Sequence, residues 1–178
     1  MKTYKIARSI ALVSALIASG SALAANDGTR GLESTGDLQV TLSVNDRVQI
    51  TRLNDIALGA FSGTGDLVGA DGFCAYRNGS GLYDLTVSSA NAAAGVFRAV
   101  SGTDFLAYTV KVDQDADASD GTLTTSGAVQ AGLAGSGTST TCANSDNAAV
   151  EVTFAEADLQ AAPTGAYVDT LTLLVQPN

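Results

Sequence analysis

Runs in which apolar and polar residues alternate recur along most of the chain. The first run covers residues 38–50 and directs every second side chain to one side: Leu38, Val40, Leu42, Val44, Val48 and Ile50. Similar runs occupy residues 73–77, 82–88, 96–100, 105–112, 123–129, 148–154 and 167–175. A period of two residues is typical of a β-strand with one buried face. The pattern therefore predicts an all-β protein that folds as one antiparallel β-sandwich.

Residues that favour turns separate these runs. Asn45 and Asp46 interrupt the first run, and Asn78-Gly79-Ser80-Gly81 follows the second. Asn-Gly is a strong hairpin signal, because both residue types accept a positive φ at low cost. Asn78-Gly79-Ser80 also matches the acceptor sequence for N-glycosylation, but we interpret it as the turn. Elsewhere the sequence predicts loops over residues 62–72 and 132–147 and, over residues 156–160, one helical turn or an acidic corner.

The first 24 residues are predicted to be an export signal. Lys2, Lys5 and Arg8 give this segment a positive start, residues 10–18 are apolar, and Ala22-Leu23-Ala24 supplies the small residues that a signal peptidase recognises. The apolar run is shorter than the roughly 20 residues that span a bilayer. We expect cleavage after Ala24 and no membrane insertion of the mature chain, with a retained membrane anchor as the alternative.

Composition restricts the chemistry of the mature chain. Without the leader, six Lys and Arg residues remain against 18 Asp and Glu residues, which gives a net charge of −12. Such an acidic surface repels nucleic-acid phosphates and anionic lipids. The chain has no His, the usual general base near neutral pH and a common metal ligand. We therefore expect a protein that is not an enzyme, needs no cofactor and does not bind nucleic acid.

Cys74 and Cys142 are the two cysteines of the chain. In an exported protein, an oxidising compartment makes a disulfide between them the expected state. The bridge would attach the segment around Cys142, which is rich in Gly, Ser and Thr, to the strand that holds Cys74. Two free thiols are the alternative.

Carboxylates recur at every second position in Asp113, Asp115 and Asp117. Calcium prefers such oxygen ligands, so these three residues are a weak candidate for a calcium site. They do not match an EF-hand loop, whose sixth and twelfth positions would hold Gly and Glu, because Ala118 and Thr124 stand there. We prefer the alternative, an acidic hairpin tip in solvent.

The C-terminal residues carry a family resemblance. Gly165-Ala166-Tyr167-Val168-Asp169-Thr170 and the alternating strand after it resemble the end of spore coat protein U-like and archaic chaperone–usher pilus subunits. Residues 50–59 and 73–76 are similar to exported relatives of that group. The sequence also suggests a tyrosine corner, in which the hydroxyl of Tyr167 bonds to upstream backbone. Many such pilins have a Cys in the first mature strand, whereas residues 38–50 contain none.

The resemblance implies an immunoglobulin-like sandwich that lacks one strand. A periplasmic chaperone, and later the N-terminal strand of the next subunit, would complete it by β-strand addition. After a mobile leader over residues 25–37, the segment 38–50 is the candidate donor strand, which would insert Leu38, Val40, Leu42 and Val44. The acceptor groove would lie beside the C-terminal strand, which presents Tyr167, Leu171, Leu173 and Val175. The alternative is that residues 38–50 form the first strand of their own domain, residues 38–178.

Together these features predict a structural subunit of an extracellular filament, a pilus or a coat, assembled by donor-strand complementation. Its implied partners are further copies of the chain, a periplasmic chaperone and an usher. The protein would pass through the periplasm to the cell surface. The second hypothesis is a self-contained secreted adhesin or matrix protein that binds carbohydrate, which the absence of Trp disfavours.

Overall fold

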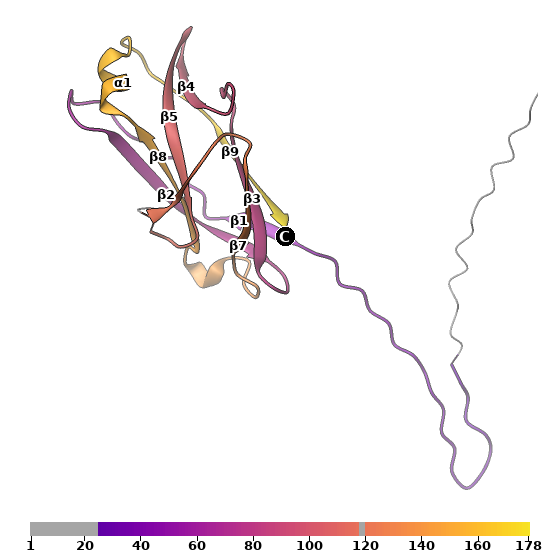
Figure 1. Ribbon diagram of the computed structural model, residues 1–178. Helices are drawn as coiled ribbons and strands as arrows, with labels where there is room; N and C mark the ends of the chain where they lie inside the picture. Colours follow the sequence, from indigo (N-terminus) through magenta and orange to yellow (C-terminus); the bar gives the residue numbers. More distant parts are fainter. Residues whose placement is uncertain (1–24, 118–119) are drawn as a thin grey trace, which may run out of the picture. The chain divides into compact units, whose positions relative to one another are not determined.

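The computed structural model describes residues 25–117 and 120–178. The predicted signal peptide, residues 1–24, lies outside the described residues. The chain divides after Val44 into an N-terminal part and a domain that runs from Asn45 to Asn178. This domain consists of antiparallel strands in two sheets, with little helix (Figure 1). The predicted all-β antiparallel sandwich is thus confirmed.

The larger sheet has the strand order β1–β2–β8–β5–β4, and β6 pairs with β5. Its strands are β1 (Val48–Thr51), β2 (Leu67–Arg77), β4 (Phe97–Ser101), β5 (Asp104–Asp113), β6 (Thr122–Thr124) and β8 (Ala148–Phe154). Strand β2 joins β1 to the rest of this sheet, because residues 67–73 pair with β8 and residues 74–77 pair with β1. Strand β1 is therefore an edge strand.

The smaller sheet has the order β7–β3–β9. Its strands are β3 (Leu82–Ser89), β7 (Val129–Ala134) and β9 (Leu171–Pro177). The C-terminal strand β9 is an edge strand that pairs with β3 alone among the described strands. One short helix, α1 (Glu156–Ala161), follows β8. A 3₁₀ turn, η2 (Cys142–Asn144), comes before β8.

Side chains from the facing sides of the two sheets form one core. The alternation in the sequence supplies them, because every second residue of each long strand points inward. Tyr108 lies between Phe97 and Phe154, with ring centroids 5.7 and 4.8 Å away. The largest fully buried side chains are those of Tyr83, Phe73, Phe97, Leu85, Val87 and Val110.

Part of the stretch predicted as a Gly-rich loop over residues 62–72 is a strand, since β2 begins at Leu67. A Cβ on Gly69 would lie 2.5 Å from Leu58 Cδ2, and a Cβ on Gly72 would lie 2.7 Å from Asp146 Oδ2. These glycines therefore mark places where other side chains pack closely on the strand, and they do not form a turn.

The stretch predicted as a loop over residues 132–147 also contains part of a strand. Strand β7 continues to Ala134, and the strand predicted over residues 123–129 is divided between β6 and β7. Gly132, with a φ of 70°, lies in β7 where its pairing with β3 is irregular. In β7, small residues and a bulge interrupt the alternation of apolar and polar residues from which strands were predicted.

The N-terminal part has no extended strand among its described residues, 25–44. Asn26 and Asp37 exchange two backbone hydrogen bonds of 2.8 Å and so close the segment between them into a loop. The strand predicted over residues 38–50 is a regular strand only from Val48 onward. Residues 38–44, which we call the donor segment, belong to no sheet.

Candidate functional site

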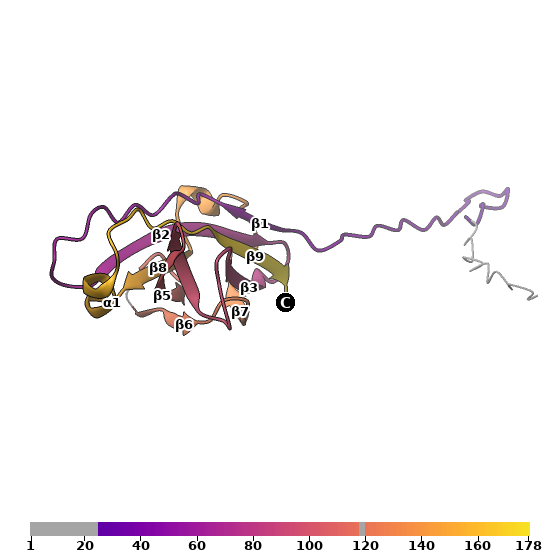
Figure 2. The same cartoon turned by 90° about the horizontal axis from the view of Figure 1, so that it is seen from above.

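The two sheets meet at strands that have free edges. Strand β1 ends the larger sheet and β9 ends the smaller one. The two strands lie next to each other (Figure 2), yet no ladder of backbone hydrogen bonds joins them within the described domain. We call the line between them, with residues 52–58 that follow β1, the β1–β9 seam. An unpaired strand edge is a template for the addition of another strand.

The core is least covered along this seam. Eight apolar residues pack against the core while staying partly exposed, and all but Phe154 lie on β1, just after it, or on β9 and the residues leading into it. The seven residues other than Phe154 are Val48, Ile50, Ile56, Leu58, Tyr167, Leu171 and Leu173. The seam therefore combines free backbone groups with half-buried apolar side chains, the two features that an added strand would cover.

The sequence prediction for β9 agrees with this arrangement in part. Leu171 and Leu173 are partly buried, as expected of a groove wall, whereas Val175 is buried in the core. Tyr167 precedes the strand, and its hydroxyl donates to the carbonyl of Pro163 at 3.0 Å, four residues upstream. The expected tyrosine-corner hydrogen bond is therefore present.

Asp169 fixes the start of β9 to the rest of the domain. Its Oδ2 accepts hydrogen bonds from the Tyr108 hydroxyl and the Ser89 hydroxyl, and its Oδ1 accepts from Asn91 Nδ2 and the Thr170 N–H. Burial raises the pKa of Tyr108, and the hydrogen bond to Asp169 raises it further. The phenol therefore stays protonated and donates. Sequence reasoning noted Asp169 only as part of a motif and did not assign it this role.

The other wall of the seam is held by the predicted disulfide. Cys74 in β2 is bonded to Cys142 in the η2 turn, with Cα atoms 5.8 Å apart. Cys74 is also the register partner of Thr51 in β1, and the Thr51 hydroxyl donates to the Thr140 carbonyl at 3.2 Å. The bridge thus anchors the segment before β8 beside β1.

The residues after β1 turn sharply away from the strand. Arg52 has a φ of 74°, which is uncommon for a residue with a Cβ. Its side chain forms an ion pair with Asp146. The next residues return along β2, where the carboxylate of Asp71 accepts from both the backbone and the side-chain amide of Asn54. Ile56 and Leu58 thereby lie over Gly69 and form part of the seam wall.

The donor segment presents its apolar side chains to solvent. Leu38, Val40, Leu42 and Val44 are 74%, 84%, 86% and 75% exposed. Four large apolar residues at alternate positions with this exposure are unusual in a folded protein, in which such contiguous surface marks interaction sites. Val48 and Ile50 continue the same alternation but belong to the seam wall.

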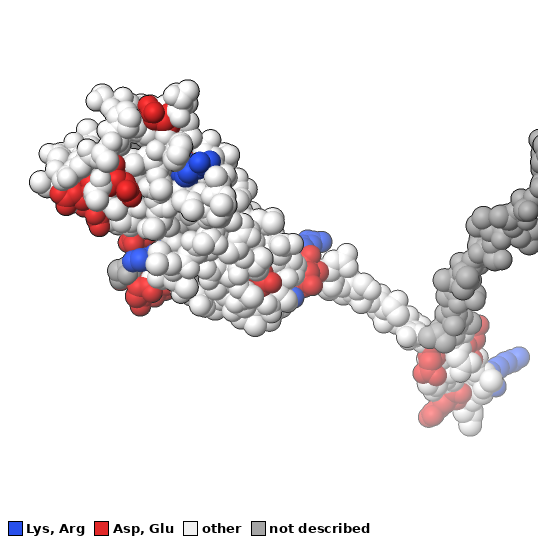
Figure 3. Space-filling view, turned by 45° about the horizontal axis from the view of Figure 1, so that its top comes forward, with Lys and Arg blue, Asp and Glu red and all other residues white. Residues whose placement is uncertain are grey.

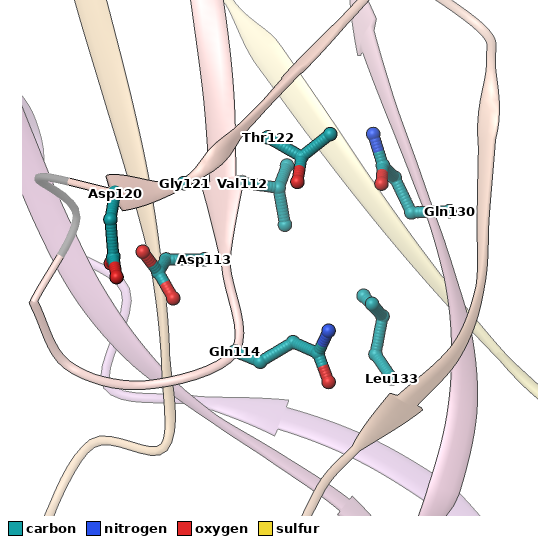
Figure 4. Close-up of a pocket in the computed structure, with 8 residues that line it drawn as sticks. All are labelled: Val112, Asp113, Gln114, Asp120, Gly121, Thr122, Gln130 and Leu133. Atoms are coloured by element: carbon teal, nitrogen blue, oxygen red, sulfur yellow. The ribbon is translucent and has the colours of Figure 1, made fainter.

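The acidic turn after β5 differs from the predicted grouping. The carboxylates that lie together, within 4.8 Å of one another, belong to Asp113, Asp115 and Asp120, and Asp117 is not part of the group. Figure 4 shows the side chains of Asp113 and Asp120 next to each other. A hydrogen bond to Asp113 and repulsion from its charge raise the pKa of Asp120. Oxygens of Asp113 and Asp115 also accept from backbone N–H groups two residues ahead, a role that needs no ion. We assign no metal to this cluster.

The disulfide indicates an oxidising environment outside the cytoplasm. Among the residues that the structure describes, no helix has the length and apolar character needed to cross a bilayer.

In comparisons with known proteins, no family model and no curated protein matches this chain.

Proposed function

We propose that the protein is a structural subunit of an extracellular filament, and that its subunits are joined by strand donation. The donor segment of one copy enters the β1–β9 seam of the next copy and adds a strand there. The leader exports the chain, and a periplasmic chaperone and an usher keep the seam covered until the next subunit arrives. The protein has no catalytic role.

One observation carries the proposal: the same chain has an uncovered seam and an exposed segment that matches it. The seam offers unpaired strand edges with half-exposed apolar side chains. The donor segment offers apolar side chains at every second residue, which is the spacing that a strand presents to one face. Because each subunit has one of each, addition can repeat head to tail without limit.

The energy available is large enough for a stable joint. Burying an aliphatic side chain contributes about 1.5–3 kcal/mol, and the donor segment has four of them. Backbone hydrogen bonds along the free edges of β1 and β9 would add to this. The acidic residues visible over the domain surface (Figure 3) would keep neighbouring filaments apart, because like charges repel.

The central test is a charge in the donor segment. Leu42→Asp would place an unpaired carboxylate in an apolar seam, which is strongly unfavourable. We expect the full-length variant to be exported but to remain monomeric or short, as seen by electron microscopy and by ladders on unboiled gels. A synthetic peptide of residues 36–50 should raise its melting temperature, because its seam is empty.

The matched control is Thr41→Asp, which adds the same charge to the adjacent position on the opposite side of the segment. It should form filaments like the wild type. If Leu42→Asp polymerises as well as Thr41→Asp does, strand donation is wrong, and a self-contained adhesin or matrix protein becomes the better hypothesis.

A further inference from the structure

We propose that Asn78 prevents the donor segment from folding back onto its own domain and thereby directs it to a second copy of the chain. The inference rests on the strand donation proposed above. It identifies a positioning residue that decides between an intramolecular and an intermolecular product.

Self-closure is a real competitor in this chain. The donor segment ends at Val44 and β1 begins at Val48, so only residues 45–47 separate them. Hairpin loops commonly have about two to five residues. Asn45 and Asp46 are also residue types that accept the positive φ of tight turns. A turn over residues 45–47 would lay the donor segment on the free edge of its own β1.

Asn78 holds residues 45–47 in a different conformation. Its backbone N–H donates to the Arg47 carbonyl at 3.1 Å, which extends the β1–β2 ladder by one pair beyond Val48 and Arg77. Its side-chain Oδ1 accepts from the Arg47 N–H at 2.7 Å, and its Nδ2 donates to the Asn45 carbonyl at 3.0 Å. None of residues 45–47 has a positive φ. We call this arrangement the Asn78 clamp.

An ion pair supports the clamp. Arg77 Nη2 lies 3.1 Å from Asp46 Oδ1, while Nη1 donates to the Ser80 hydroxyl at 2.8 Å and to the Leu82 carbonyl at 3.0 Å. The Arg77 side chain is only 14% exposed, but that of Asp46 is 58% exposed, so solvent weakens their attraction. The hydrogen bonds of the Asn78 side chain are therefore the main restraint.

A reverse turn at residues 45–47 is incompatible with the clamp. The backbone groups of Asn45 and Arg47 that Asn78 binds would have to change direction, so both side-chain hydrogen bonds would break together. Each such bond contributes a modest net stability, and losing two shifts an equilibrium by roughly tenfold or more. The clamp also occupies Nδ2, the atom that a glycan would modify.

The test is Asn78→Ala in the full chain, which removes both side-chain bonds and keeps the backbone pair. We expect monomers in place of filaments in sedimentation and electron microscopy. Because the donor segment then occupies its own seam, the peptide of residues 36–50 should leave the melting temperature of this variant unchanged. The double variant Asn78→Ala/Leu42→Asp should regain stabilisation by the peptide, since a charged donor segment cannot occupy the seam.

The control is Ser80→Ala, which removes the glycosylation sequence and one hydrogen bond of Arg77 but keeps both side-chain hydrogen bonds of Asn78, the main restraint. It should form filaments like the wild type. Filaments of Asn78→Ala in wild-type amounts would overturn the proposal, and so would Asn78→Ala monomers that the peptide stabilises as much as it stabilises Leu42→Asp. If the wild type forms no filaments, or if the peptide does not stabilise Leu42→Asp, strand donation itself fails and this inference fails with it.

Discussion

Asp169 shows how one half-buried carboxylate can set the position of a whole edge strand. It accepts hydrogen bonds from groups on β3, on β5 and on the residues leading into β9. A carboxylate is the suitable group, because its two oxygens offer several acceptor positions. The start of β9, and with it one wall of the seam, depends on this residue.

We expect Asp169→Ala to lower the free energy of unfolding by about 2–4 kcal/mol, because it leaves the buried Tyr108 hydroxyl without an acceptor. Urea unfolding followed by circular dichroism measures the loss. Adding Tyr108→Phe should cost less in this variant than in the wild type, since the two residues form one network. Asp55→Ala, at an exposed carboxylate elsewhere, serves as the control. An unchanged urea midpoint for Asp169→Ala would contradict the role assigned to it.

At the scale of strands, regular alternation made much of the fold predictable. Strand β8 matches its predicted range, and β3 and β5 lie within a residue of theirs, because large residues alternate along them without interruption. Strand β7 and the first half of β2 were missed. Their glycines and alanines do not alternate between apolar and polar types. These small residues are explained by tertiary contacts, such as that between Gly69 and Leu58, which the sequence does not show.

The candidate site was predictable only in part. Residues 38–50 form one continuous pattern in the sequence, yet the structure divides it into an exposed donor segment and a seam wall that contains Val48 and Ile50. The interruption at Asn45 and Asp46 marked the boundary. The clamp that fixes it could not be predicted, because Asn78 lies 31 residues beyond Arg47 and its turn sequence does not reveal what its side chain binds.

The disulfide supports β1 as an element of the seam. Replacing both Cys74 and Cys142 with Ala should lower stability by about 2–5 kcal/mol, as is typical when a native disulfide is removed from a small secreted domain. The melting temperature of the variant should equal that of the reduced wild type. Hydrogen exchange should rise most in residues 135–147 and in β1. Free thiols in unreduced wild-type protein would contradict the bridge.

In the filaments proposed above, the charge of the whole molecule would govern how neighbouring filaments meet. The full chain has a net charge of −9 and an isoelectric point of about 4.1, and removal of the predicted leader would make the charge −12. Repulsion between like-charged surfaces keeps proteins apart and weakens as the net charge approaches zero.

We therefore expect filaments to stay separate at neutral pH and to associate side by side as the pH falls toward about 4, because protonation of carboxylates removes the repulsion. Light scattering and electron microscopy follow the change, and the joints themselves should persist, since they depend on apolar contacts. Bundling at neutral pH and low salt would argue against the role given to charge. Dissociation into monomers at pH 5 would argue against joints that depend on apolar contacts.

The Asn78 clamp also has a mechanical consequence. If the proposed filament were pulled along its length, the load would pass from the donated strand through residues 45–47 into β1. The clamp extends the β1–β2 pairing to Arg47 and Asn78. The pull would then run parallel to these strands, and the hydrogen bonds between them would resist it together in shear instead of opening one after another. The disulfide at Cys74 would pass the load on to the segment before β8 through a covalent bond.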